Sequence, residues 1–462
     1  MDDLIAVKSS ADVFSWIAKF INFEKGLGGR DFKLDRMRAL AELAGHPEHC
    51  APAIHVAGSK GKGTVTGMIA AILEEEGFNV ARYTSPDVND KRERITQGGR
   101  FFEEDRYIEA GKELIRLEGK LRAAGGKYRL PFAGATGDGA PTFFELITLY
   151  FFLCARQGAC NFLAVETGMG GRLDATNIVD PLVSVITLIE KEHTKYLGDT
   201  IAAIAGEKAG IIKPGRPLAL AEQSPEALEV FQNRARFSES PLFYLPDMAH
   251  ISGIHITKGG SFFTLHDRGG GFLPASLELF VPIPGEAQAY NAGLAALAAK
   301  TALPSLKETS IQRGLARFTL PARFEKIRED PEFIIDGAHT ARSMELCVKT
   351  FVQLYGEGGI LLFGCAAGKD TQGMAKIMGP HFSRIIITAP GTFRTSYPRE
   401  VFDIFQKTGN KEKVLLIEDT ARAIEKTLAL GRGQGLPVLG AGSFYLAGEI
   451  RSRVKNTAPT LP

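Results

Sequence analysis

The apolar and polar positions of this chain repeatedly predict a short buried strand followed by a helix. The run from Ile54 to Ala57 is apolar and partly β-branched, which is typical of a buried strand. From Thr64 the apolar positions fall three or four apart, and this spacing predicts a helix that ends near Gly77. Further strands are expected at 162–166, 183–189, 333–335, 359–364, 384–389, 413–418 and 437–440. Strands that alternate with helices predict parallel sheets flanked by helices, an α/β fold.

The same patterning divides the chain into two regions. Helices are expected within 10–45 and over 103–124, 143–156 and 287–303, whereas 125–141 is rich in Gly, Ala and Pro and is expected to be a loop. Residues 240–283 alternate in the manner of antiparallel strands. A new cycle of strands and helices starts at about 319, so we place a boundary within 306–320. A length of 462 residues is enough for two or three domains.

Composition and charge exclude several classes of protein. Hydrophobic residues make up 44% of the chain and charged residues 23%, which is ordinary for a globular domain. A net charge of +2 favours neither nucleic acid nor an anionic membrane as a partner. The longest apolar runs, such as 146–153, are too short to span a bilayer, and residues 1–4 lack the features of a signal peptide. Five scattered cysteines without a CxxC pair favour a reducing compartment. We expect a cytoplasmic protein.

The loop between the first strand and its helix is the strongest chemical signal. It runs from Gly58 to Thr64 through Ser59, Lys60, Gly61, Lys62 and Gly63, so three of its seven residues are glycine. Backbone N–H groups and a helix N-terminus in such a loop form a cradle for phosphate. Lys62 would reach the outer phosphates, and the Thr64 hydroxyl suits Mg²⁺. The strict P-loop pattern is not met, because Gly63 separates Lys62 from Thr64, and a plain strand-to-helix turn remains the alternative.

Other polar residues follow predicted strands, and each has an ordinary interpretation as well. Glu166 ends a strand before a glycine-rich turn, and a carboxylate beside a phosphate loop commonly holds Mg²⁺. His193 alone predicts only a hydrogen-bonded turn residue, and Lys208 alone only a solvated helical lysine. Asp336 and His339 follow a strand of the second region, and 440–445 forms another glycine-hydroxyl turn. Together they predict a ligand cleft between two domains.

Read together, these motifs resemble the folylpolyglutamate synthase/dihydrofolate synthase family, a branch of the Mur-ligase group of ATP-dependent amide ligases. The resemblance covers roughly 15–450. Its anchors are Gly58–Thr64, Thr84–Pro86, Arg92–Ile95, Thr142–Glu145, Glu166–Asn177, His193–Gly198, Glu207–Gly215, Arg323–Glu325, Asp336–His339 and Gly442–Arg451. It implies a P-loop-type ATPase domain with a mostly parallel sheet over 1–313. A smaller Rossmann-like α/β domain would follow over 319–462, with the active site in the interdomain cleft.

The resemblance also implies roles for individual residues. ATP would bind Gly58, Ser59, Lys60, Gly61, Lys62, Gly63, Thr64, Gln288, Asn291, Arg323 and Asp336. One Mg²⁺ would bind Thr64, Ser85 and Glu166, and a second would bind Glu166 and His193. Lys208 matches a position that is carbamylated in relatives, where it serves as a metal ligand. Lys62, Lys208 and His193 would be the catalytic residues, Asp174 would contact the pterin, and His339 and Ser443 would contact glutamate.

Six positions depart from the family's commonest residues. They are Lys60 for asparagine, Thr64 for serine, Asp87 for histidine, Glu192 for aspartate, Ala287 for histidine and Thr340 for asparagine. The phosphate, metal and carbamate positions are all retained.

The activity implied is ATP-dependent addition of L-glutamate to a folate, to dihydropteroate or to both, through an acyl phosphate, by a monomer. Two alternatives stay open at this point. One is a Mur-type ligase for a non-folate carboxylate, although no UDP-binding domain is recognisable before residue 50. The other is a nucleotide-dependent switch without ligase activity, against which the ordered motifs in both regions argue.

Overall fold

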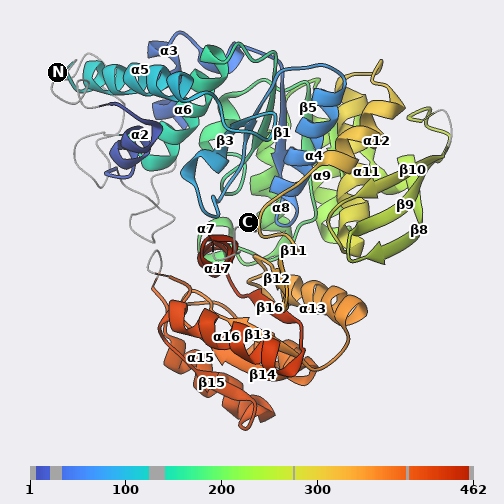
Figure 1. Ribbon diagram of the computed structural model, residues 1–462. Helices are drawn as coiled ribbons and strands as arrows, with labels where there is room; N and C mark the ends of the chain where they lie inside the picture. Colours follow the sequence, from blue (N-terminus) through green and yellow to red (C-terminus); the bar gives the residue numbers. More distant parts are fainter. Residues whose placement is uncertain (1–6, 21–33, 124–140, 274–275, 392–394, 457–462) are drawn as a thin grey trace, which may run out of the picture.

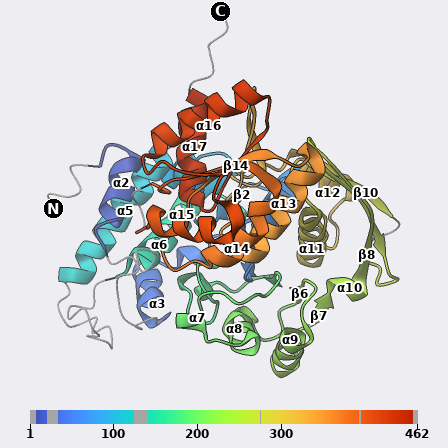
Figure 2. The same cartoon turned by 90° about the horizontal axis from the view of Figure 1, so that it is seen from below.

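The computed structural model describes residues 7–20, 34–123, 141–273, 276–391 and 395–456. These residues form a larger N-terminal lobe and a smaller C-terminal lobe, with a small antiparallel sheet on one side of the larger lobe (Figure 1). Seen from below, the C-terminal lobe lies across the middle of the N-terminal lobe (Figure 2). The expected α/β fold with two domains is confirmed, while the expected loop at 125–141 lies almost wholly outside the described residues.

In the large sheet of the described residues, the strand that leads into the phosphate loop lies at the centre. Its order is β3-β2-β4-β1-β5-β6-β7. The strands are β1 Ala53–Ala57, β2 Val80–Tyr83, β3 Ile95–Gln97, β4 Phe162–Glu166, β5 Val183–Ile186, β6 Leu218–Leu220 and β7 Leu242–Tyr244. All neighbouring pairs are parallel except β2 and β3, which are antiparallel. The carboxyl ends of β2, β4, β1 and β5 therefore meet at one edge.

Alternation along the strands builds a core on each face of this sheet. In β4, Phe162 and Ala164 face one core, and Leu163 and Val165 face the other. The first core is covered by α4 Lys62–Glu75, α11 Glu286–Ala302 and α12 Glu308–Arg317. The second is covered by α2 Ser10–Ile17, α3 Leu34–Leu43, α5 Glu104–Ala123 and α6 Phe143–Gln157. Both faces of the sheet are thus buried, as parallel sheets require.

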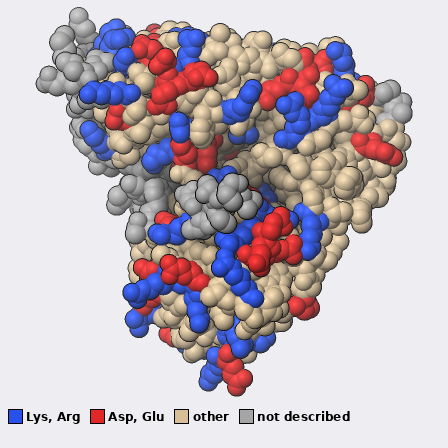
Figure 3. Space-filling view, in the orientation of Figure 1, with Lys and Arg blue, Asp and Glu red and all other residues tan. Residues whose placement is uncertain are grey.

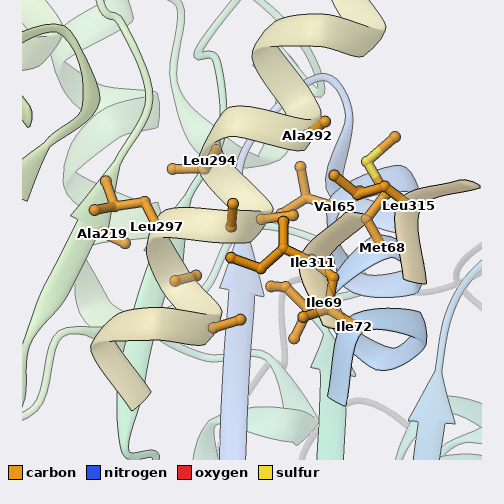
Figure 4. Packing of buried hydrophobic residues seen from close by; sticks show 14 of the residues in the cluster. Val65, Met68, Ile69, Ile72, Ala219, Ala292, Leu294, Leu297, Ile311 and Leu315 are labelled. Atoms are coloured by element: carbon orange, nitrogen blue, oxygen red, sulfur yellow. The ribbon is translucent and has the colours of Figure 1, made fainter. Parts of the chain in front are cut away.

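Helix α4 is fixed by close apolar packing. Figure 4 shows its residues Val65, Met68, Ile69 and Ile72 against Ala292, Leu294 and Leu297 of α11 and Ile311 and Leu315 of α12. All of these side chains are almost completely buried. Because burying one such aliphatic side chain contributes about 1.5–3 kcal/mol, this packing holds the start of α4, and with it the phosphate loop, in one position.

The rest of the N-terminal lobe covers the far edge of the sheet. Its helices are α7 Thr194–Leu197, α8 Ile201–Lys208, α9 Pro225–Phe237 and α10 Leu245–Met248, and its antiparallel sheet contains β8 Ala249–Thr257, β9 Gly260–Asp267 and β10 Leu277–Val281. The antiparallel expectation for 240–283 holds for β8 to β10. It is wrong for β7, which pairs in parallel with β6. A strand of only three residues is too short to display a period.

The C-terminal lobe repeats the parallel design with the sheet order β11-β12-β16-β13-β14-β15 in the described chain. Its strands are β11 Glu325–Glu329, β12 Glu332–Ile335, β13 Gly359–Phe363, β14 Phe382–Ile387, β15 Val414–Leu416 and β16 Val438–Ala441. Its helices are α13 Ala341–Tyr355, α14 Thr371–Met378, α15 Pro398–Phe405, α16 Thr420–Gln434 and α17 Phe444–Asn456. Phe318, just after α12, and Leu320 pack against the N-terminal core, whereas Ala322 and Phe324 pack in the C-terminal lobe, so the chain crosses between the lobes at 320–322.

Short 3₁₀ and π turns complete the described structure. They are η2 Pro47–His49, η3 Lys91–Arg94, η4 Ala175–Ile178, η5 Ala209–Ile211, η6 Gly379–His381 and the π turn η7 Gln406–Asn410. Among the described helices, none has both the length and the apolar character needed to cross a bilayer.

Candidate active site

A cavity of about 1930 Å³ opens between the two lobes, lined by the strand ends of both sheets. Its wall includes most of the residues singled out from the sequence: Ser59, Lys60, Gly61, Lys62, Gly63, Thr64, Ser85, Glu166, Asp174, His193, Gln288, Asn291, Arg323, Asp336, His339 and Ser443. Gly58 and Lys208 lie behind this wall, and both are buried. On the face shown in Figure 3 the molecule narrows between the lobes, and basic and acidic side chains are interspersed.

The phosphate loop depends on glycine where the chain has no room for a side chain. Gly58 has φ +146°, and a Cβ there would overlap the Thr187 side chain. Gly61 has φ +83°, and its Cβ would lie 2.6 Å from Asn291 Oδ1. The loop thereby approaches the start of α11, where Asn291 Nδ2 donates to Gln288 Oε1 over 3.4 Å. The unpaired N–H groups at the start of α4 favour an anion at this point.

Two lysines converge on one carbonyl oxygen behind the loop. Lys62 Nζ donates to Gly58 O over 3.0 Å, and Lys208 Nζ donates to the same oxygen over 2.7 Å. Lys208 is 1% exposed and also donates to Glu192 Oε1 over 2.8 Å. Burial, together with Lys62, lowers the pKa of Lys208 to about 8. Burial alone would raise the pKa of Glu192, but the adjacent Lys62 and Lys208 hold it at about 2.

Glu166 lies beside the loop because β4 pairs with β1 in a register that aligns Glu166 with Val56. Its Oε2 accepts a hydrogen bond from Ser85 N over 2.9 Å, and a Cβ on Gly63 would lie 3.2 Å from the same oxygen. Burial raises the pKa of Glu166 to about 6, although the nearby Lys62 opposes this rise. The carboxylate and the hydroxyls of Ser85 and Thr64 are the oxygen ligands that Mg²⁺ prefers.

His193 lies at the N-terminus of α7, in the left-handed region with φ +48°. Desolvation in the cavity lowers its pKa to about 4, so the neutral ring that metal binding requires is the main form at neutral pH. Glu166 and His193 therefore offer one oxygen and one nitrogen ligand to the same cavity.

The C-terminal lobe contributes a buried acid and a stacked guanidinium. Asp336 accepts hydrogen bonds from the backbone of Phe324 over 2.8 Å and of Ala338 over 2.7 Å. Burial raises the pKa of Asp336, while the neighbouring Arg323 opposes this. The Arg323 guanidinium lies 4.2 Å from the centre of the Phe444 ring. This stacking orients the cation toward the cavity at little entropic cost.

His339 and Ser443 come from neighbouring strand ends, after β12 and β16. His339 Nδ1 lies 2.8 Å from Gly337 O, which can only accept, so the proton is on Nδ1 and Nε2 can accept a hydrogen bond. Burial lowers the pKa of His339 to about 3. Ser443 Oγ accepts from Leu446 N over 3.0 Å, and its own hydrogen can still be donated. The pair can thus bind a ligand that carries both donors and acceptors.

At the other end of the cavity, Asp174 is already engaged by the protein. It accepts from Met169 N over 2.9 Å and from Thr176 N over 3.1 Å, which caps η4. Sequence reasoning missed the neighbouring pair Arg36 and Glu145, in which Arg36 Nε contacts both carboxylate oxygens at 2.8 and 2.9 Å. Both side chains are largely buried and line the cavity.

Sequence signals for these missed residues are uneven. Glu145 is preceded by Thr142 in the spacing of a capping box, which the structure forms at the start of α6. Arg36 has no local signal, because its partner is 109 residues away. Of the departures from the family pattern, Asp87 pairs with the buried Arg94, and Thr340 caps α13.

Comparisons with known proteins agree with this architecture. The family model described as Mur ligase middle domain matches 121–299, and that described as Mur ligase, glutamate ligase domain matches 322–444. A dihydrofolate synthase/folylpolyglutamate synthase of Bacillus subtilis (strain 168) is 31% identical over 452 residues, which cover 96% of this chain and 99% of the relative.

Solved structures show the same relationship. A Mycobacterium tuberculosis folylpolyglutamate synthase complexed with ADP and AMPPCP superposes with a TM-score of 0.83 at 26% identity, covering 92% of this chain and 95% of that one. An FPGS–AMPPCP–folate complex superposes with a TM-score of 0.80 at 26% identity, covering 96% and 99%. The chain therefore belongs to the folylpolyglutamate synthase/dihydrofolate synthase family of Mur ligases, and it is an ATP-dependent ligase that joins L-glutamate to its acceptor through an amide bond.

Proposed function

We propose that this ligase adds L-glutamate both to dihydropteroate and to a reduced folate, with ATP as the activating substrate. The observation that carries the proposal is that a single cavity contains the phosphate loop, the Glu166 carboxylate and the strand ends of the C-terminal lobe. Support for two acceptors comes from the Bacillus subtilis relative, whose name carries both activities and which matches almost from end to end. A cavity of about 1930 Å³ has room for a nucleotide and an elongated acceptor together.

In the proposed reaction the acceptor carboxylate attacks the γ-phosphate of ATP, which gives an acyl phosphate and ADP. The neutral amine of glutamate then attacks the acyl carbon, and the tetrahedral intermediate loses a proton from nitrogen and expels phosphate. Lys62 and the loop N–H groups bind the phosphates and offset the charge that develops on them. Arg323 and Asp336 contact the nucleotide from the second lobe, and Gln288 and Asn291 contact it from α11. His339 and Ser443 hold the incoming glutamate, and the enclosing lobes keep water from the acyl phosphate.

Two Mg²⁺ ions belong to this proposal. Thr64, Ser85 and Glu166 would hold the first, and Glu166 and His193 would hold the second. The donor set fits, since a buried carboxylate, two hydroxyls and a neutral imidazole all face the phosphate loop. Such ions supply Lewis-acid stabilisation of the transferring phosphoryl group.

Carbamylation of Lys208 completes the proposed second metal site. In this reaction the lysine cation first loses a proton, the neutral amine attacks CO₂ to form a C–N bond, and a second proton is released, so that the cation becomes an anion. The lowered pKa of Lys208, about 8, leaves a sizeable fraction of neutral amine near physiological pH. As a cation, Lys208 is attracted to Glu192 and repelled by Lys62. As a carbamate it would instead be attracted to Lys62 and repelled by Glu192.

The remaining proposals concern the state of the protein in the cell. We propose that it acts as a monomer in the cytoplasm on small-molecule substrates, without nucleic-acid or membrane partners. A net charge of +2 and the absence of an apolar spanning helix among the described residues are compatible with this. Size-exclusion chromatography with light scattering tests whether the protein is a monomer in solution.

The proposal is tested by phosphate release from Mg-ATP and glutamate, with dihydropteroate or tetrahydrofolate as the acceptor. Stimulation by both acceptors is expected, and stimulation by one alone would restrict the protein to that step. Stimulation by neither would overturn the folate proposal in favour of a different carboxylate. Lys62→Ala should abolish the acceptor-dependent release, whereas Lys112→Ala, a change in an exposed surface pair, should not.

A further inference from the structure

The connection from α3 to β1 carries two imidazoles and a carboxylate that point at one another. His46, Glu48 and His49 each offer one ligand atom, and all three atoms lie within 4.8 Å of one another. His46 Nδ1 lies 2.9 Å from Glu48 Oε1, and His49 Nε2 lies 3.8 Å from the same oxygen. The two imidazole rings are stacked, with their centres 5.5 Å apart. None of the three residues lines the cavity between the lobes.

A second observation is that one oxygen of the Glu48 carboxylate has an unused acceptor position, although the other is hydrogen-bonded to His46. Glu48 is only 5% exposed, and its second oxygen, Oε2, has no hydrogen-bond partner among the described residues. A buried carboxylate oxygen without a partner is costly, and such atoms are rare in folded proteins. The histidines are exposed on the solvent side of the carboxylate, so an ion from solution can reach the cluster.

The geometry suits a small dication with nitrogen and oxygen ligands. Zn²⁺ binds imidazole and carboxylate at about 2.0–2.2 Å, so two ligands in a tetrahedral site lie roughly 3.3 Å apart. The observed separations of 2.9 and 3.8 Å lie on either side of this value. The nearby Arg156 does not fill the position, because it donates to Ala44 O and pairs with Glu113 over 2.6 Å.

We propose that His46, Glu48 and His49 form a structural site for a first-row transition-metal dication, for which Zn²⁺ is the probe. Two imidazoles and one carboxylate match the ligand preference of Zn²⁺ and its neighbours, and water completes the coordination. The ion would fix η2 where it packs against α6, at the start of the segment that leads through β1 into the phosphate loop. Its role is in stability and is separate from the Mg²⁺ chemistry of the cleft.

The test is an equilibrium titration of the full-length protein with Zn²⁺, and with Co²⁺ as a spectroscopic probe, in saturating Mg²⁺ and AMPPCP so that the cleft is occupied. Wild type should bind one equivalent more than His49→Gln, and its Co²⁺ complex should show visible bands that the variant lacks. His255→Gln, which changes an exposed histidine on β8, should behave as wild type.

A thermal readout separates this site from adventitious surface binding. At a free Zn²⁺ concentration of 100 Kd, a site present only in the folded protein raises the folded-to-unfolded ratio about hundredfold. The melting temperature of wild type and of His255→Gln should therefore rise with Zn²⁺, and that of His49→Gln and His46→Gln should not. Equal stoichiometry and equal thermal shifts in all four proteins would overturn the proposal.

Discussion

Gly58→Ala tests whether the phosphate loop is held by the packing seen behind it. An alanine at φ +146° carries a backbone penalty of about 1–3 kcal/mol. Its Cβ would also overlap Thr187 Oγ1 and lie 2.9 Å from Thr187 Cβ and 3.0 Å from the Thr187 backbone nitrogen. Overpacking of this kind adds about 1–3 kcal/mol. We therefore expect the free energy of unfolding of the N-terminal lobe to fall by about 2–6 kcal/mol.

The same substitution should reduce turnover. Gly58 O accepts hydrogen bonds from both Lys62 and Lys208, so a shift of the loop displaces together two lysines that the proposed mechanism uses. If about 2 kcal/mol of this distortion opposes the transition state, kcat falls roughly 30-fold. Urea unfolding followed by circular dichroism measures the first effect, and acceptor-dependent phosphate release measures the second.

Gly77→Ala is the matched control, because Gly77 has φ +103° but nothing lies within 4 Å of its Cβ position. It should show only the backbone penalty of about 1–3 kcal/mol and normal turnover. Thr187→Ala in the Gly58→Ala background removes the nearest atom, which has no hydrogen-bond partner to lose, and should restore part of both losses. The reasoning is refuted if Gly58→Ala is as stable and as active as Gly77→Ala.

The remaining predictions concern four side chains. Lys62→Ala should lower kcat at least about 100-fold without a comparable loss of stability, and full activity would contradict the phosphate-loop assignment. Lys208→Ala should abolish turnover, and added small carboxylates should restore part of it. Carbamylation would be contradicted if the wild type kept normal activity in bicarbonate-free buffer and mass spectrometry showed an unmodified lysine. Burial raises the pKa of Glu166 to about 6, so below that pH the carboxyl is protonated and Mg²⁺ affinity should fall about tenfold per pH unit; an affinity that is unchanged from pH 7.5 to 5 would contradict its role as a ligand. The same shift means that the contribution of Glu166 to the stability of the metal-free protein is lost as the pH rises from about 4.5 through about 6, and a Glu166→Gln variant should lack this contribution. Arg36→Ala strands a buried carboxylate and should cost about 3 kcal/mol in urea unfolding, whereas the exposed Arg38→Ala should cost less than about 1 kcal/mol; equal losses would contradict the burial argument.

The elements that the sequence predicts best are those in which local chemistry and long-range packing agree. The strand at Ile54, the glycine loop and α4 were expected in nearly the observed positions, because glycine placement and helical spacing are both local signals. Helix α12 and the strands β6 and β11 were not expected. β6 has only three residues, and the residues of α12 fall in the stretch assigned to a domain boundary.

Pairing across the sequence explains the remaining gaps at the site. Lys208 alone has the pattern of a surface lysine, and only the fold brings it against Gly58, 150 residues earlier. Glu192 was noted as a substitution but not as the partner of Lys208. Arg36 reaches Glu145 across two helices. In each case the sequence shows the residue but not which distant residue it contacts, because the fold determines the distance between the two side chains.

The crossing of the chain between the lobes, at 320–322, couples Arg323 to any movement of the C-terminal lobe. Leu320 packs against the N-terminal core and Ala322 lies in the C-terminal lobe, so the chain changes lobes within three residues. Arg323 directly follows this crossing and lines the cavity. Any swing of the C-terminal lobe must therefore turn the guanidinium, and an anion bound to that guanidinium restrains the swing.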